Sequence, residues 1–391
     1  MKIAFLTHHD PHDRTSWSGA LFYMLRALDR HCGDVVPLGP TGRGYYLAGK
    51  LCRLGLRVFA SQNVDYKRTV ALSRAFAGIF ERKLARDHFD IIFAPVASTE
   101  IAFLNTELPI VRFEDVTAKL FQNYAASLEG LSAWSLAQCE VIETRALERA
   151  DRLVYPSQWT AQSAIVDYGV SETKIEVFPM GANLDEIPDR DKVMAIRNNG
   201  PGKNCRLLFV GVDWDRKGGD IALATMQELR RRGVNASLTI VGCRPPAHLA
   251  DPNCHVIPFL DKRKPEDRDQ IGALFLNSDF MVFPTRRDAS PLVCCEASAF
   301  GLPQIVSDVG GLPVRDGVNG IRLPAAASAP EYADAMQRLF EDHDQYVSLA
   351  RSSRDEFESS LNWDAWGRAM DRVFRDVLEK RSGFHQSESV R

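Results

Sequence analysis

A loop in the second half of the chain brings together a carboxylate, a hydroxyl and the start of a helix. Asp288 and Ser290 follow a short apolar run, and a helical pattern begins at Pro291. Pro291 suits the first turn, because its missing N–H would lack a partner there in any case. The N–H groups of Leu292 and Val293 would then point toward an anion, which helix N-termini bind well. The spacing therefore predicts a phosphate site.

Two further features support a nucleotide at this place. Glu296 lies one turn into the helix, where its carboxylate can accept hydrogen bonds from a pair of hydroxyls such as those of a ribose. Arg216 and Lys217 precede another helix, and two cations beside a helix N-terminus suit a diphosphate. The alternative interpretation is a capped surface helix in which Asp288 only forms a turn.

Metal binding is not the favoured interpretation of the acidic and histidine clusters. Asp213 and Asp215 form a D-x-D pair, but no third oxygen ligand is apparent, so we expect turn and capping roles. His8, His9 and His12 share a proline-containing loop, whereas zinc requires four ligands at fixed spacing. We therefore expect no metal.

The end of this histidine-rich loop suits a backbone contact to phosphate. Ser18 and Gly19 open a helix, but the loop falls short of the G-x-G-x-x-G pattern of dinucleotide-binding proteins. The sequence therefore predicts no dinucleotide cofactor.

These loops are spaced by alternating strand and helix patterns, which is typical of parallel sheets. A stretch rich in Gly, Asn, Asp and Pro, residues 181–204, separates two such series and indicates a linker. The predicted fold is α/β, of two Rossmann-like domains facing each other across a cleft. The predicted strands are residues 2–7, 34–38, 90–94, 109–113, 152–155, 174–178, 206–211, 237–241, 255–258, 280–284 and 304–307, and the predicted helices include 19–30, 66–87, 132–150, 157–168, 219–232 and 363–380.

The domain boundaries follow from the same pattern. We expect an acceptor-side domain at residues 1–182, a linker at 183–204 and a donor-binding domain at 205–362. Residues 363–391 should form a C-terminal helix that packs back near the first domain and ends in a frayed tail. Parallel sheets bind ligands at the carboxyl ends of their strands, which is where the loops above lie.

The composition excludes several classes of protein. The chain has 391 residues, of which 45% are hydrophobic, so it is long enough for two domains and is not disordered. A formal net charge of -3 provides no basic field for nucleic acid. Its 8 cysteines lack metal-binding or redox spacing, and Cys294 and Cys295 lie in an apolar stretch typical of core thiols. No membrane-spanning or secretory segment is predicted, so we expect a cytoplasmic protein.

Several segments together resemble the retaining glycosyltransferases of family 4. In that family two acidic residues separated by seven others, here Asp288 and Glu296, precede a G-x-P-x-I turn. A D-G-x-N-G turn, an F-V-G…K-G element and a turn before the linker are also similar. The matching segments are residues 288–297, 300–303, 307–313, 316–320, 209–211 with 217–218, and 178–183.

The resemblance implies a GT-B fold and a nucleoside-diphosphate sugar as donor substrate. It implies that Asp288 contacts the donor sugar, that Glu296 holds the ribose and that Lys217 neutralises the diphosphate. The backbone of Ser290 through Val293 would line the pyrophosphate. Gly19, with Ser18, would admit the diphosphate to the first domain, and Phe259 with Leu260 would meet the base.

The chain departs from the family pattern at four positions. Asp288 stands where Glu is usual, Val212 replaces an Arg, which leaves Arg216 as the substitute, and Ser18 replaces a Gly. Glu114 stands at the place of the family's His, directly before Asp115. Glu114 or Asp115 would orient the acceptor or the sugar.

The predicted activity is hexosyl transfer, with retention at the anomeric carbon, to a hydroxyl of a glycan, a lipid-linked or a small-molecule acceptor. A nucleotide-sugar epimerase or hydrolase, and a non-catalytic nucleotide-sugar sensor, are the alternatives. The basic, amphipathic segment 66–87 packs on its sheet or touches the inner face of a membrane. The growing charge of the leaving diphosphate would be stabilised by Lys217 and Arg216, so that no metal is required.

Overall fold

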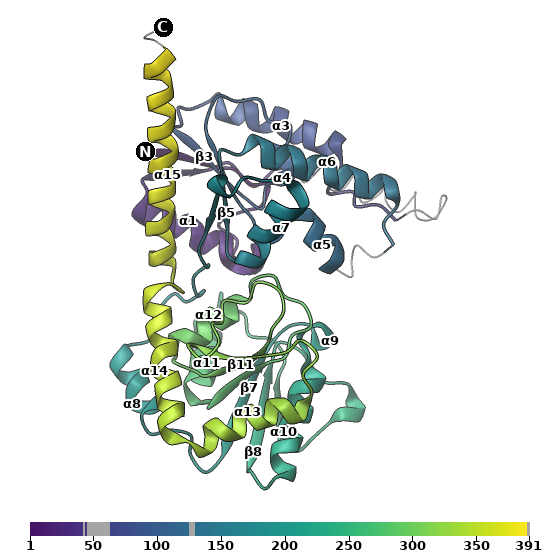
Figure 1. Cartoon of the computed structure of the whole chain (residues 1–391), viewed down its shortest axis with the longest axis vertical. Coiled ribbons are helices and arrows are strands. Elements are labelled where there is room, and N and C mark those ends of the chain that lie inside the picture. Colours follow the sequence, from purple (N-terminus) through teal and green to yellow (C-terminus); the bar gives the residue numbers. More distant parts are fainter. Residues whose placement is uncertain (42–43, 45–62, 125–129, 389–391) are drawn as a thin grey trace. The chain divides into compact units, whose positions relative to one another are not determined.

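The computed structural model describes residues 1–41, 44, 63–124 and 130–388. The chain forms two compact units: unit 1 comprises Met1–Pro179 and Trp366–Arg391, and unit 2 comprises Met180–Ala365. Each unit contains one six-stranded sheet, and all paired strands run parallel (Figure 1). The predicted α/β class with two Rossmann-like units is confirmed.

The sheet of unit 1 has the order β2-β1-β3-β4-β5-β6. β3, β4 and β5 are buried along their whole length, as expected for parallel strands covered by helices on both faces. All six strands fall within or close to predicted ranges. The strands are β1 (Lys2–Phe5), β2 (Asp34–Pro37), β3 (Ile91–Pro95), β4 (Ile110–Phe113), β5 (Arg152–Tyr155) and β6 (Ile175–Val177).

The helices of unit 1 start and stop at identifiable caps. α7 begins after Ser157, whose hydroxyl accepts the N–H of Thr160, and ends at Gly169 with φ of 67°, as predicted. α3, α4 and α6 lie together on one face of the sheet (Figure 1). The helices are η1 (Ser16–Gly19), α1 (Ala20–His31), α3 (Val70–Leu84), α4 (Ser98–Ile101), α5 (Ala118–Tyr124), α6 (Ala133–Arg149), α7 (Gln158–Tyr168) and η3 (Glu172–Lys174).

α3 is shorter than predicted, because Thr69 caps it and the residues before it form turns. Its apolar side chains, including Leu72, Phe76 and Phe80, are buried in the core of unit 1. The sequence left open whether this segment packs on its sheet or touches a membrane. The structure shows that its apolar face packs on the sheet.

A long C-terminal helix, α15 (Trp363–Glu388), completes unit 1. Trp366 and Phe374 each pack edge-on against Phe93 of β3, with ring centroids 5.9 and 6.0 Å apart. Arg152 of β5 forms an ion pair with Asp376. The helix continues to Glu388, so the segment expected to fray is helical over most of its length.

The sheet of unit 2 has the order β12-β11-β10-β7-β8-β9. β12 is not among the predicted strands. It is only four residues long, half-buried, and follows directly on a Gly- and Asn-containing turn, so its pattern is weak. The strands are β7 (Cys205–Val210), β8 (Ala236–Val241), β9 (Cys254–Ile257), β10 (Phe280–Phe283), β11 (Gln304–Ser307) and β12 (Gly320–Leu323).

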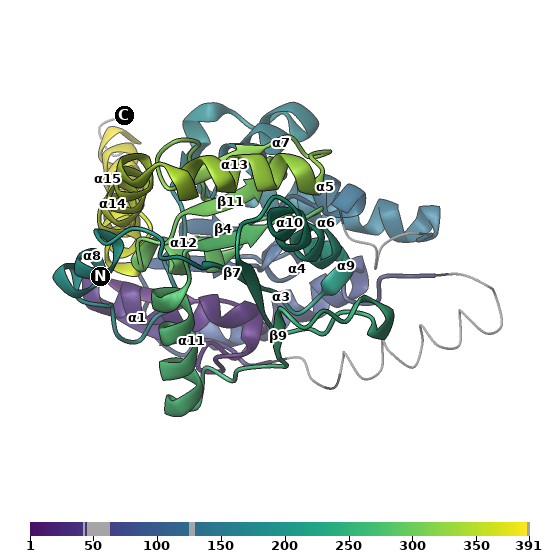
Figure 2. The same cartoon turned by 90° about the horizontal axis from the view of Figure 1, so that it is seen from below.

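Helices cover both faces of this second sheet. α10 and α13 pack side by side over one face (Figure 2), whereas α11 and α12 contribute to a separate core cluster. Cys294 and Cys295 lie in that cluster as buried free thiols. The helices are α8 (Arg190–Arg197), α9 (Trp214–Lys217), α10 (Gly219–Arg231), η4 (Ala247–Leu249), α11 (Pro265–Asn277), α12 (Leu292–Ala299), α13 (Ala329–Glu341) and α14 (His343–Ser359).

The segment predicted as a linker contains α8, which is anchored in unit 2 by Arg197. This buried guanidinium donates hydrogen bonds to the carbonyl oxygens of Phe275, Ser278 and Phe300 at 2.6–3.0 Å. Removing it would leave three buried carbonyls without a donor.

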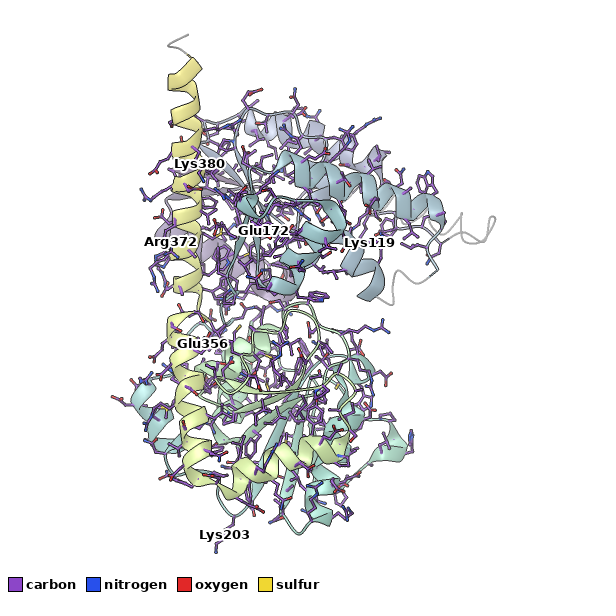
Figure 3. The ribbon with its side chains drawn as sticks, viewed as in Figure 1. Lys119, Glu172, Lys203, Glu356, Arg372 and Lys380 are labelled. Carbon is purple, nitrogen blue, oxygen red and sulfur yellow. The ribbon has the colours of Figure 1, made fainter. Side chains whose placement is uncertain are left out.

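Many charged side chains lie on the outer surface. Lys203, Arg372 and Lys380 point away from the ribbon (Figure 3). Within the described ranges, no helix combines the length and the apolar character needed to cross a membrane.

Candidate active site

The strand order of unit 2 places its binding edge between β7 and β10. The strands after β7 extend the sheet to one side and those after β10 extend it to the other. Ligands of doubly wound sheets bind at this reversal, beyond the carboxyl ends of the two strands. The loops that leave β7 and β10 carry the residues predicted from the sequence to bind a diphosphate and a sugar.

The loop after β7 is a single helical turn, α9, held tightly against the end of β10. The carboxylate of Asp213 accepts the N–H of Arg216 at 3.0 Å, which confirms its predicted capping role. Gly218 has φ of 75°, and a Cβ placed on it would lie 2.0 Å from the carbonyl oxygen of Pro284. Only glycine allows this approach, which brings Lys217 over the end of the sheet.

Lys217 and Asp288 form an ion pair at this edge. Their side chains are 11% and 13% exposed, and the ammonium also lies 4.9 Å from the ring centre of Phe283. Arg216 is close by, with Nη1 3.8 Å from Oδ2 of Asp288 and 3.0 Å from the carbonyl oxygen of Arg287. Asp288 is 71 positions after Lys217 and 72 after Arg216 in the sequence. The fold brings the three side chains together.

The charge state of this cluster depends on burial. Burial, followed by the neighbouring Arg216, lowers the pKa of Lys217 to about 7. The contact with the Asp288 carboxylate acts in the opposite direction and favours the ammonium form. The site thus holds a nearly buried amine whose charged form is favoured by an adjacent anion.

Arg286 joins the two loops and was not predicted to do so. Its N–H donates to the carbonyl oxygen of Arg216 at 2.8 Å, and its guanidinium forms a bidentate pair with Asp220 of α10 at 2.7 and 2.9 Å. The preference of arginine for planar carboxylate pairing explains this role, but the sequence offers several arginines and no signal that selects this one.

The helix after β10 begins one residue later than predicted. Pro291 is the N-cap of α12, with ψ of 112°, and Leu292 is the first helical residue. The correction is small, because the N–H groups of Leu292 and Val293 still lie before the first hydrogen bond of this turn, which runs from the N–H of Cys294 to the carbonyl oxygen of Pro291. Ser290 precedes this turn, and Leu292 and Val293 are half-buried.

Glu296 is buried in the second turn of α12, with 3% of its surface exposed. It forms an ion pair with Lys262, which the sequence analysis did not identify. Lys262 lies two residues after Leu260 in the loop that follows β9, where Phe259 is 64% exposed and Leu260 is half-buried. The proposed ribose and base positions are therefore linked by this contact.

In unit 1, the backbone near Ser18 and Gly19 is unusual. Trp17, Ser18 and Gly19 have φ of 46°, 56° and 84°, and Val96 after β3 has φ of 46°. Trp17 and Ser18 lie in the loop after β1, and Val96 follows β3. The order of this sheet reverses between these two strands. Such conformations cost free energy and concentrate at functional sites.

The histidines of the same loop make contacts within unit 1. His8 pairs with the buried Glu100, and its ring stacks on Phe76 with centroids 5.9 Å apart. Burial, followed by the neighbouring His8, lowers the pKa of His9 to about 4. Residues 1–41, 44, 63–124 and 130–388 contain no group of three or more His, Cys, Asp or Glu side chains placed to hold a metal ion.

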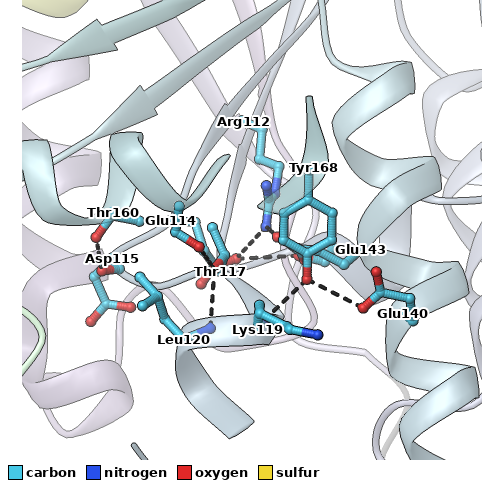
Figure 4. A network of polar contacts seen from close by, with 12 residues as sticks. Arg112, Glu114, Asp115, Thr117, Lys119, Leu120, Glu140, Glu143, Thr160 and Tyr168 are labelled. Atoms are coloured by element: carbon cyan, nitrogen blue, oxygen red, sulfur yellow. Dashed lines mark hydrogen bonds and ion pairs between the residues drawn. The ribbon is translucent and has the colours of Figure 1, made fainter. Parts of the chain in front are cut away.

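Glu114 and Asp115 follow β4 and belong to a polar network (Figure 4). Oε2 of Glu114 accepts from Nη2 of Arg112 and from Oγ of Ser98, both at 3.4 Å, and Glu114 is 9% exposed. Burial raises the pKa of Glu114 to about 8, while Arg112 opposes this effect. Burial also raises the pKa of Asp115 to about 6.

Comparison with known proteins agrees with this geometry. A family model described as Glycosyltransferase Family 4 matches residues 20–186, and one described as Glycosyl transferases group 1 matches residues 204–342. The D-inositol 3-phosphate glycosyltransferase of Corynebacterium aurimucosum is 27% identical over 256 residues, which are 61% of this chain and 60% of the relative. That of Nocardia farcinica is 30% identical over 223 residues, 53% of this chain and 48% of the relative. The chain thus aligns with only about half to three fifths of each relative.

Solved structures share the fold. Sucrose-phosphate synthase from Thermosynechococcus elongatus superposes with a TM-score of 0.67 at 18% identity, over 97% of this chain and 99% of that chain. Anabaena HepE, solved in complex with UDP and glucose, superposes with a TM-score of 0.60 at 15% identity, over 96% and 99% of the two chains. The two family models, taken with the parallel sheets and the acidic pair Asp288 and Glu296, show that the chain belongs to the family 4 glycosyltransferases, of GT-B fold.

Proposed function

We propose that this protein is a retaining glycosyltransferase that moves a hexosyl unit from a nucleoside-diphosphate sugar to a hydroxyl acceptor. The observation that carries this proposal is the convergence of Arg216, Lys217 and Asp288 at the edge between β7 and β10. The two cations suit the diphosphate of such a donor, and the carboxylate suits the hydroxyls of its sugar. The bond between the anomeric carbon and the diphosphate oxygen breaks, and its electron pair leaves with the diphosphate.

The donor is held mainly by unit 2. Asp288 accepts hydrogen bonds from sugar hydroxyls, and the backbone from Ser290 through Val293 lines the pyrophosphate. Glu296 binds the ribose hydroxyls, for which its burial and its negative charge are suited. The backbone at Phe259 and Leu260 meets the base. The family relationship supports these assignments, and each rests on a described loop at the carboxyl edge of the sheet.

Charge stabilisation needs no metal in this proposal. Negative charge grows on the leaving diphosphate, and Lys217 with Arg216 offsets it in a site from which water is largely excluded. Transfer activity that is undiminished in the presence of a chelator would agree with this assignment. Loss of activity on chelation, restored by a divalent cation, would contradict it.

The acceptor is bound by unit 1, with Glu114 and Asp115 as the groups that orient the acceptor or the sugar. The inositol phosphate named for the Corynebacterium and Nocardia relatives makes a phosphorylated cyclitol the first acceptor to test. A glycan and a lipid-linked hydroxyl are the next. A lipid-linked acceptor would bring the protein to a membrane surface.

The decisive experiment measures binding and transfer separately. Calorimetric titration with UDP and with UDP-glucose, the ligands of the HepE structures, tests the donor site. NMR of the product formed with inositol 3-phosphate or another acceptor then reports the anomeric configuration. Inversion would overturn the retaining assignment. Release of free sugar or of an epimer without acceptor, or binding without turnover over a broad panel, would overturn transfer.

A further inference from the structure

A buried arginine next to the candidate acceptor site has one close carboxylate partner, and its Nη2 also donates to Oγ of Ser98 at 2.7 Å. Arg112 of β4 is 1% exposed, and Nη2 donates to Oε1 and Oε2 of Glu143 in α6 at 2.8 and 3.0 Å. Glu143 is itself 3% exposed. The two charges therefore neutralise each other in the interior of unit 1.

Glu114 is the second carboxylate beside this one cation. Its Oε2 lies 3.4 Å from the same Nη2, longer than either bond to Glu143. The remaining partner, the hydroxyl of Ser98, is neutral and also 3.4 Å away. A buried charge without a close counter-charge is costly, so this carboxyl is the group that gains most from holding a proton.

The other charged groups around Glu114 do not supply the missing cation. Asp115 adds a negative charge from the next residue, and Arg68, which lies before α3, is engaged with Asp65 at 3.5 Å and with the ring of Phe121. Tyr155 of β5 contributes only a neutral hydroxyl, because burial raises its pKa above the ordinary value. Figure 4 shows Arg112 of β4, Glu114 directly after β4 and Glu143 of α6 converging on one another.

We propose that the Arg112–Glu143 pair holds Glu114 as a neutral carboxylic acid, which donates a hydrogen bond to an oxygen of the ligand bound at the end of β4. Oε2 accepts the two hydrogen bonds of the network, so the proton belongs to Oε1. Arg112 and Glu143 are positioning residues, because they act through Glu114. The identity of the ligand as a sugar or acceptor hydroxyl rests on the proposed function, whereas the protonation of Glu114 does not.

The raised pKa of Glu114, about 8, agrees with this arrangement. A neutral carboxyl can donate, whereas a carboxylate can only accept. The distinction gives the site a pH dependence: the donor is present at neutral pH and is lost as the pH rises through the pKa of Glu114. A glutamine at this position would keep a donor over the whole range.

Infrared spectroscopy of the full-length protein without any ligand tests the protonation directly. The difference between the wild type and Glu114→Gln at pH 7 should contain the C=O band of one protonated carboxyl, which titrates away near pH 8. In Glu143→Gln, Arg112 has only Glu114 as its carboxylate partner, so the midpoint of this titration should fall by about one pH unit or more. Glu140→Gln, a half-buried change on the same helix, should leave the midpoint unchanged.

A pH profile of sugar transfer adds the functional test. The pH profile of Glu114→Gln should show no alkaline decline, and Glu143→Gln should move that decline to lower pH without raising the donor KM. The double variant Glu114→Gln with Glu143→Gln should behave as Glu114→Gln does.

The outcomes separate the two proposals. Absence of the carboxyl band at pH 7 would overturn the neutral Glu114, even if Glu143→Gln failed to fold, and an unchanged midpoint in folded Glu143→Gln would overturn the positioning role. A wild-type protein that shows the band but transfers no sugar would refute the proposed function and leave the neutral acid established.

Discussion

The ion pair between Lys217 and Asp288 makes the substitution Asp288→Asn the most informative test of the donor site. The carboxylate of Asp288 forms an ion pair with Lys217, the cation that the diphosphate is proposed to need. A free nucleoside diphosphate must therefore displace Asp288 from Lys217. An intact donor makes the same exchange but gives Asp288 a new partner, the sugar. The substitution should consequently act in opposite directions on the two ligands.

The size of the effect follows from the burial of the pair. Both side chains are nearly buried, at 11% and 13% exposure, so solvent screens their interaction little. A charge-assisted hydrogen bond contributes about 1.5–3 kcal/mol, and a neutral amide retains part of it. We expect Asp288→Asn to bind free UDP about three- to tenfold more tightly. Turnover of the intact donor should fall about a hundredfold or more, because contacts to the sugar and its positioning are lost.

The tighter binding of UDP should depend on pH. Burial and Arg216 lower the pKa of Lys217 to about 7, and Asp288→Asn removes a carboxylate that favours the ammonium form. In the variant the ammonium therefore predominates at pH 6, and its population falls as the pH rises. The gain in affinity should therefore be largest at pH 6 and should shrink by pH 8.

Calorimetric titration at pH 6 and pH 8, with UDP and with a UDP-sugar, measures these quantities. Asp220→Asn is the matched control, because it removes a carboxylate from the neighbouring pair with Arg286, whose side chains are both 45% exposed. The control should change UDP affinity less than twofold, as expected for an exposed pair. If Asp288→Asn weakened UDP and the UDP-sugar equally, the reasoning about displacement would be wrong.

Three other substitutions test the donor site, the loop and the buried network. Glu296→Gln should weaken UDP and UDP-sugar by about tenfold alike, measured by the same titration, since both ligands carry the ribose; unchanged affinities would contradict the ribose assignment. Gly218→Ala should destabilise unit 2 by about 2 kcal/mol or more in a denaturant titration, because its Cβ would lie 2.0 Å from a carbonyl oxygen; Gly233→Ala, with φ of 88° and open space, should cost less. Glu114→Gln should stabilise the protein increasingly from pH 5 to pH 8, by up to about 4 kcal/mol, because the folded wild type holds a proton on Glu114 that the unfolded chain has lost. Thermal unfolding at several pH values measures this, and equal stabilities of the variant and the wild type at every pH would contradict it.

The strands and most helices could be predicted because the physical signal is local. Short apolar runs separated by helical periodicity specify buried parallel strands, and caps such as Ser157 and Gly169 mark the helix ends within a residue. The strand that was missed has a local cause too. β12 is short and half-buried, so its sequence pattern is weak.

The candidate donor residues could be found from the sequence because each lies next to a strand end or a helix start. Asp288, Lys217 and Glu296 all occupy such places, and parallel topology brings the ends of β7 and β10 together. The position of Asp288 on Lys217 in the absence of ligand could not be inferred in the same way. It depends on how closely the loop at Gly218 packs on β10, which is a property of the folded backbone.

Lys262 and the pair of Arg112 with Glu143 mark the limit of reasoning from the sequence. Nothing in the local pattern distinguishes Lys262 from the other cations of its loop, or Glu143 from the other acidic residues of α6, until the fold selects their partners. For Arg112 the sequence does predict a partner, because a charged residue inside an otherwise apolar strand needs a buried counter-charge. It does not predict which residue provides that counter-charge. A cation in the middle of a buried strand therefore predicts that some carboxylate on a covering helix must neutralise it. Once Glu143 takes that role, Glu114 at the strand end has no equivalent cation of its own, and its protonation follows from the count of charges rather than from the residue type.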